Sequence, residues 1–214
     1  MHDFSKQKTV MHGSQKGQIP WAEVGIENGT RLVSTSDELS RKMKEGLAGL
    51  SDPGIPDFEG ARWRYEFCIF VMFWMWYVAN SPKLTKLGAT KPLLDAYHQA
   101  CCEAMIGAGL LDNSEKALGA WEGDLEERFM AYKGAYENVH ARPDFAVRLT
   151  GRGSIGWLFS RYLFPGQDPD PRFVALVNDF GSITFQGLAK MVRSLEADYR
   201  PTAEAERRWW EFWK

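Results

Sequence analysis

Residues 58–80 read FEGARWRYEFCIFVMFWMWYVAN, and this stretch decides the fold. From Phe67 to Ala79 it holds 13 consecutive apolar residues, with Glu66 immediately before them. A membrane-spanning helix needs about 20 such residues, so the run is too short to cross a bilayer. Its length and its methionine and tryptophan content favour a helix over a strand, and a helix that is apolar nearly all round has to be buried. We therefore expect a central helix surrounded by others.

Helical patterns lie on both sides of this segment. Apolar residues recur every three or four positions in several further stretches, and turns containing Pro, Gly or Asn separate them. No stretch alternates apolar and polar residues as a half-buried strand does. The sequence predicts an all-α fold, a single-domain helical bundle of five to seven helices with a buried aromatic central helix. The flanking helical stretches are 35–50, 90–111, 113–140, 145–164 and 171–199.

The ends of the chain differ from its middle. Residues 1–34 are polar, contain several glycines and show no periodicity, which predicts a flexible N-terminal arm. Thr35 with Glu38 forms a capping-box pattern, so we expect the helical bundle to span 35–200. Residues 201–214 are predicted to form a short Trp-rich C-terminal helix.

Three glycines interrupt the helical pattern of residues 113–140, namely Gly119, Gly123 and Gly134. Each costs about 1 kcal/mol of helix stability relative to alanine. Since a glycine lets another backbone come near, we expect close helix approach at these positions.

Charge and cysteine content narrow the function classes. The chain has 26 Lys+Arg against 28 Asp+Glu, a net charge of -2, which argues against a nucleic-acid partner because such proteins carry a strongly basic face. Residues 1–18 lack the apolar core of a secretory signal. Three cysteines, two of them adjacent, do not resemble a disulfide framework. These observations favour a cytoplasmic protein without a transmembrane segment.

A metal site is the first candidate for chemistry. Asp95 and His98, and likewise Glu137 and His140, place a carboxylate and an imidazole one helical turn apart, and Glu66 could add a carboxylate. Di-iron helical bundles use pairs of this kind on two helices. The second pair lies on the polar side of its helix and the first pair has Asp in place of Glu. We therefore keep a carboxylate/His metal-dependent enzyme only as the second alternative.

Other catalytic patterns are weak. Gly151, Gly153 and Gly156 match a dinucleotide fingerprint in spacing, but the flanking residues are helical and no strand precedes them. No Gly-x-Ser-x-Gly elbow occurs. We expect no catalytic residues and no cofactor, and an enzyme is the less favoured interpretation.

The aromatic central segment offers a candidate ligand pocket. Phe70, Trp74 and Tyr77 recur at helical spacing, and pockets between bundle helices are lined by such side chains. Plain core packing is the more usual role of an aromatic stripe. A carrier or sensor of a small hydrophobic ligand is therefore the first alternative function.

The C-terminus offers a candidate partner-binding segment, Trp209, Trp210, Phe212 and Trp213. Exposed tryptophans are costly in water, and aromatic residues dominate the binding energy of protein interfaces. They could instead pack on their own bundle or make a weak contact with a membrane surface. The leading hypothesis is a non-enzymatic cytoplasmic protein that acts by protein–protein interaction as an adaptor or regulator, with homo-oligomerisation a further option.

Overall fold

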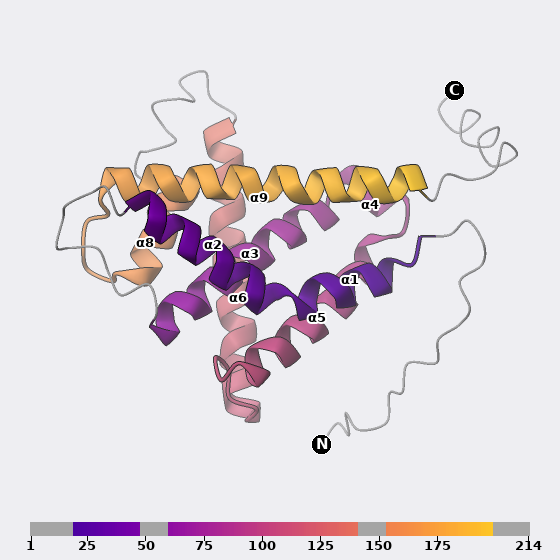
Figure 1. Ribbon diagram of the computed structural model, residues 1–214, viewed down its shortest axis with the longest axis horizontal. Helices are drawn as coiled ribbons and strands as arrows, with labels where there is room; N and C mark the ends of the chain where they lie inside the picture. Colours follow the sequence, from indigo (N-terminus) through magenta and orange to yellow (C-terminus); the bar gives the residue numbers. More distant parts are fainter. Residues whose placement is uncertain (1–18, 48–59, 141–152, 199–214) are drawn as a thin grey trace, which may run out of the picture. The chain divides into compact units, whose positions relative to one another are not determined.

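The computed structural model describes residues 19–47, 60–140 and 153–198, and within these ranges it holds eight α-helices and no strand (Figure 1). The predicted all-α fold is confirmed. Two short helices, α1 and α4, lie where the sequence analysis expected none. The helices are α1 (Trp21–Thr30), α2 (Leu32–Leu47), α3 (Ala61–Ala79), α4 (Pro82–Lys86), α5 (Thr90–Gly107), α6 (Glu115–His140), α8 (Ile155–Leu163) and α9 (Pro171–Asp198).

The contacts of the chain divide it into two units, residues 21–190 and residues 1–20 together with 191–214. Of the smaller unit, the structure describes only residues 19–20 and the end of α9 from Met191. The larger unit holds the aromatic core and the helices α1 to α8.

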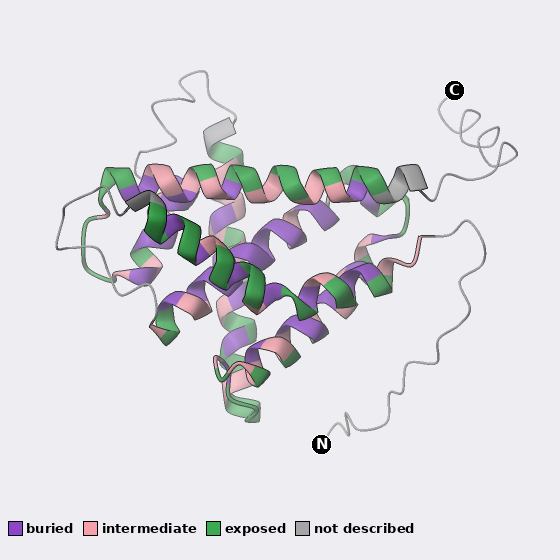
Figure 2. Cartoon of the chain, viewed as in Figure 1, coloured by how far each residue is buried: buried purple, intermediate pink, exposed green. Residues whose placement is uncertain are grey.

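Helix α3 is the central helix of the larger unit, as its sequence predicts. Every residue from Glu66 to Met75 is buried (Figure 2), and α2, α5, α6 and α8 all contact this helix. Aromatic rings of α3 meet rings of neighbouring helices, as where Phe70 lies 5.0 Å from Phe159 of α8 and 5.9 Å from Tyr132 of α6 between centroids. Such pairs add to the hydrophobic burial that holds the helices together.

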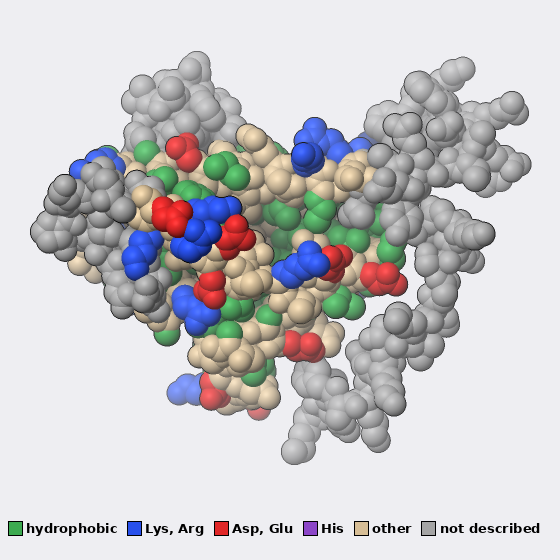
Figure 3. Space-filling model, viewed as in Figure 1, with side chains coloured by type: hydrophobic (Ala, Val, Ile, Leu, Met, Phe, Trp, Pro, Cys, Tyr) green, Lys and Arg blue, Asp and Glu red, His purple; other side chains and the backbone are tan. Residues whose placement is uncertain are grey.

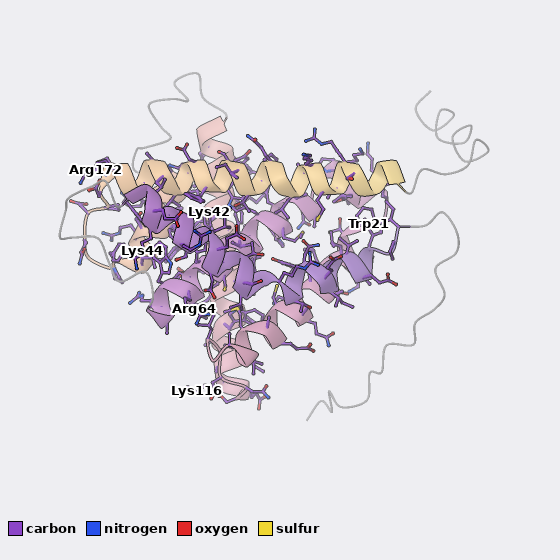
Figure 4. All side chains as sticks on the ribbon, in the orientation of Figure 1. Trp21, Lys42, Lys44, Arg64, Lys116 and Arg172 are labelled. Carbon is purple, nitrogen blue, oxygen red and sulfur yellow. The ribbon has the colours of Figure 1, made fainter. Side chains whose placement is uncertain are left out.

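Helix α2 covers one side of α3 and presents a charged outer face. Figure 3 shows acidic and basic side chains side by side over α2, where Glu38 pairs with Lys42 at 2.8 Å. Arg64 of α3, labelled in Figure 4, donates two hydrogen bonds of 2.9 Å to the carboxylate of Asp37 in α2. These exposed pairs contribute little stability.

Residues 19–34 differ from the prediction of a flexible arm. Residues 21–30 form α1, which packs along α5 through Gly25 and Gly29. A Cβ added at Gly25 would lie 2.4 Å from the Leu93 carbonyl oxygen, and one at Gly29 would lie 2.7 Å from the Tyr97 carbonyl oxygen. Glycine lets the two backbones touch, a kind of contact that leaves no amphipathic pattern in the sequence. Residues 1–18 lie outside the described part of the chain.

The start of α2 also differs from the prediction. This helix begins at Leu32, one turn before the capping box expected at Thr35. The Thr35 amide donates to the carbonyl of Arg31 at 2.9 Å, a bond to the fourth residue back that places Thr35 within the helix and not at its N-cap. The bundle therefore starts at Trp21 and not at residue 35.

The glycines of α6 make no close contact with the described part of the chain. Within residues 19–47, 60–140 and 153–198, a Cβ at Gly119, Gly123 or Gly134 would meet nothing within 4 Å, so the close helix approach expected there is not found. Close approach occurs instead at Gly156 of α8, whose added Cβ would lie 2.3 Å from the Val174 carbonyl oxygen of α9. It occurs also at Gly181, against the ring of Trp74.

No helix in the described ranges combines the length and the apolar character that crossing a bilayer requires. This agrees with the short apolar run of α3, which Glu66 and Arg64 precede.

Candidate ligand-binding site

The face of α3 that the sequence proposed as a pocket is filled by neighbouring rings. Phe70 and Trp74 are 1% and 2% exposed. The ring of Trp74 lies 5.4 Å from that of Tyr136 and 5.9 Å from that of Phe185, between centroids. Tyr77 contacts the same two rings. Phe70 and Trp74 belong to the core, and Tyr77 beside them is half-buried against the rings of Tyr136 and Phe185.

A pocket of about 220 Å³ lies on the other side of α3 and is partly open to solvent. Met72 and Trp76, two positions away from Phe70 and Trp74, face it. Because successive helical residues are rotated by about 100°, a shift of two positions turns a side chain to nearly the opposite face. The residues that line the pocket are Met72 and Trp76 from α3, Leu94, Asp95, Tyr97 and His98 from α5, and Phe129 from α6.

Two half-buried aromatic rings form one wall of this pocket. The centroids of Trp76 and Phe129 lie 5.4 Å apart, with their planes tilted by 43°. Phe73, which is fully buried, contacts both rings from the core side at 6.1 and 5.9 Å. The wall is therefore held in place from behind, while the pocket-lining surfaces of the two rings remain partly accessible.

The polar part of the pocket comes from α5, where Asp95 and His98 stand one turn apart. The Asp95 carboxylate accepts a hydrogen bond of 2.5 Å from the ammonium of Lys91. Both side chains are mostly exposed, so this pair contributes little stability and can exchange partners. The pocket thus offers a carboxylate whose present partner is a solvated lysine.

His98 lies against Trp121 of α6, with ring centroids 4.7 Å apart and planes within 9° of parallel. Burial lowers the pKa of His98 below its ordinary value of 6.5, and the nearby carboxylates of Glu122 and Asp95 offset this only in part. At neutral pH the imidazole is therefore uncharged, with one donor and one acceptor nitrogen. The sequence could not reveal this stacking, because it depends on how α5 packs on α6.

The residues considered for a metal site are engaged elsewhere. Glu66 is 3% exposed and its carboxylate accepts two hydrogen bonds of 3.0 Å from Arg128 of α6. Glu137 is exposed, 3.9 Å from Lys133. The side chain of His140 lies outside the described residues. Among the side chains that are described, no three His, Cys, Asp or Glu residues gather as a metal would require.

The Glu66–Arg128 pair is the buried part of a polar cluster that the sequence did not predict. Arg128 also donates to Asp124 at 3.0 Å, and its guanidinium lies 4.2 Å from the ring centroid of Tyr162. The hydroxyl of Tyr65 donates to Asp124 at 2.7 Å. A single acidic residue beside the apolar run was the only signal, and its basic partner lies 62 positions along the chain. The cluster joins α3, α6 and α8 and holds their orientation.

The glycine pattern at residues 151–156 leads into a helix start. Gly153 has a φ of +87°, a conformation that favours glycine, and the Ser154 side chain accepts a hydrogen bond of 3.2 Å from the Trp157 amide. The amide of Gly156 donates to the side chain of Asn178 at 2.9 Å. In the described part of this motif, the glycines serve a turn and a helix contact.

The Trp-rich segment, Trp209, Trp210, Phe212 and Trp213, lies outside the described residues. Comparison of the chain with protein-family models, with curated proteins and with solved structures finds no match.

Proposed function

We propose that this protein binds a small, largely apolar ligand in the pocket between α3, α5 and α6, and acts as a carrier or sensor of that ligand. The observation that carries the proposal is the half-buried pair Trp76 and Phe129 beside a hollow of about 220 Å³. Partly open aromatic surface next to one or two polar groups is the usual composition of a small-molecule site.

The volume sets the size of the ligand. An apolar cavity of about 150 Å³ accommodates benzene. The 220 Å³ pocket therefore has room for one aromatic ring with a short substituent, and it is too small for a long acyl chain or a dinucleotide. Because the pocket is partly open, a substituent can extend into solvent past Asp95.

Ligand-observed NMR with a neutral single-ring probe, 2-phenylethanol, tests the proposal. A probe of about nine non-hydrogen atoms should bind with a Kd on the order of 1 mM. Phe129→Leu keeps an apolar residue but removes the ring, and should weaken binding at least about fivefold, an effect near 1 kcal/mol.

Met130→Leu is the matched control, since Met130 is the next residue of α6, is 59% exposed and does not line the pocket. This variant should bind as the unchanged protein does. Absence of binding up to about 10 mM, or equal binding by the Phe129→Leu protein, would refute a ligand site here.

A second candidate function is protein–protein interaction through the C-terminal segment. Its support is the sequence, which places Trp209, Trp210, Phe212 and Trp213 within five consecutive residues. Aromatic residues at this density are typical of binding hot spots. In this proposal the protein is a non-enzymatic adaptor or regulator, and self-association through the same aromatic residues is one form of it.

Removal of residues 202–214 tests the second candidate. A partner captured by the full chain should be lost, while the helical content and the urea midpoint stay the same. Retention of the partner by the truncated chain would refute the role of the segment. Unfolding of the truncated chain would show that the segment belongs to the core. Sedimentation of both chains compares their self-association.

We place either function in the cytoplasm. The three cysteines are free thiols, and Cys68 and Cys101 are buried in the helical core. Proteins of oxidising compartments more often use their cysteines in disulfides. Fractionation of the source cells tests this location.

A further inference from the structure

The pocket carries one formal charge among its described lining residues, the carboxylate of Asp95. An anionic ligand would meet that carboxylate as a like charge, whereas a cationic ligand would find a partner. The present partner of Asp95 is the ammonium of Lys91, which comes from outside the lining set. The Asp95 carboxylate can therefore pair with a primary ammonium, as it does with that of Lys91.

The aromatic wall of the pocket also favours a cationic ligand. The faces of Trp and Phe rings carry negative potential and attract cations, with Trp the stronger of the two. Trp76 and Phe129 are close enough, at 5.4 Å between centroids, for one ligand to touch both. A ligand that rests on this wall and extends a basic nitrogen towards Asp95 would gain from both interactions.

We infer that the ligand class of this pocket is a small amine, a single apolar ring or equivalent body joined by a short chain to a positively charged nitrogen. The inference rests on the proposed ligand-binding function and specifies its ligand. The apolar body lies against Trp76, Phe129 and Met72, and the ammonium replaces that of Lys91 on Asp95.

His98 should make the affinity of the pocket for an amine depend on pH. Its neighbours with charge are Asp95 on the same helix and Glu122 on α6. While the imidazole is neutral it does not oppose a cation. When acidification protonates it, a positive charge appears one turn from Asp95 and competes with the ligand for that carboxylate. Affinity for the amine should therefore fall as the pH drops through the titration of His98.

Three probes with one ring and different charge test the inference, namely 2-phenylethylammonium, 2-phenylethanol and phenylacetate. The ammonium should bind at least about fivefold more tightly than the alcohol, and phenylacetate more weakly than both. Lys91→Gln should increase the affinity for the ammonium, because it removes the competing cation.

Asp95→Asn should reduce the affinity for the ammonium to that for the alcohol and leave the alcohol unaffected. Asp95 is exposed, so this substitution is compatible with folding. Asp179→Asn, an exposed acid on α9 that does not line the pocket, should change neither affinity.

The possible outcomes distinguish a failure of the amine class from a failure of the ligand-binding function. If all three probes bind equally and Phe129→Leu weakens all of them, the function stands and the amine class is refuted. The same conclusion follows if Asp95→Asn leaves the ammonium affinity unchanged. If no probe binds, the ligand-binding function fails and the amine class fails with it.

Discussion

The guanidinium of Arg128 in α6 and the carboxylate of Glu66 in α3 form a two-point ion pair inside the helical core, with both hydrogen bonds at 3.0 Å. Glu66 is 3% and Arg128 9% exposed. Removal of Arg128 leaves the Glu66 carboxylate buried without its counterion, whereas removal of both partners avoids that cost. The pair therefore favours the one packing of α3 on α6 in which Glu66 and Arg128 meet.

Arg128→Met should lower the free energy of unfolding by about 3–5 kcal/mol, because Glu66 then stays buried without a partner. The double variant Glu66→Leu/Arg128→Met should be more stable than Arg128→Met alone. Urea denaturation measures both. Arg41→Met, which breaks the exposed pair with Glu45, is the control and should cost less than about 1 kcal/mol. A double variant less stable than either single one would contradict the explanation.

Gly25→Ala or Gly29→Ala should destabilise the protein by about 1–3 kcal/mol, because the added methyl would lie under 3 Å from backbone atoms of α5. Gly119→Ala in α6 is the matched control. Its Cβ would meet nothing within 4 Å, so the higher helix propensity of alanine should raise stability by about 0.5–1 kcal/mol. Circular dichroism during thermal unfolding measures the stability of all three variants. Equal effects at Gly25 and Gly119 would show that α1 does not pack on α5 in this way.

The stability of the protein should fall in alkaline solution because of Cys68. Burial raises the pKa of this thiol from 9.0 to about 11, so the folded state disfavours the thiolate. The resulting stabilisation is complete below pH 9 and is lost between pH 9 and 11, at about 1.4 kcal/mol per pH unit. Urea midpoints at pH 8 and pH 10 should therefore differ more for the unchanged chain than for Cys68→Ala. If the urea midpoint changes equally between pH 8 and pH 10 in both proteins, groups other than Cys68 cause the alkaline sensitivity.

His98 should titrate below 6.5, since burial disfavours its charged form. Protonation then favours the unfolded state, so the contribution of His98 to stability is complete above pH 6.5 and declines as the pH falls below that value. NMR titration of the imidazole measures the midpoint directly. Glu122→Gln removes a carboxylate that raises this pKa and should lower the midpoint further. A midpoint above 6.5 would mean that the carboxylates outweigh burial.

The sequence by itself determined the fold class and the central helix. Thirteen consecutive apolar residues after Glu66 require burial over most of the helix surface, and this requirement does not depend on which helices provide the cover. The start of α6 also depends on local sequence alone, since the Ser114 hydroxyl accepts a hydrogen bond of 3.3 Å from the amide of Ala117, three residues along the chain.

The tertiary structure decided which side of α3 is core and which side lines a pocket. Phe70 and Trp76 are both aromatic residues of one helix, but Phe70 packs against Phe159 of α8 whereas Trp76 faces the pocket that α5 and α6 also line. It also decided which glycines allow close contact, because Gly25 touches the backbone of α5 whereas a Cβ at Gly119 would have no described atom within 4 Å. Likewise, Glu66 acquires its role from Arg128, 62 positions away. Each of these contacts joins residues far apart in the chain, so the local periodicity of the sequence does not predict them.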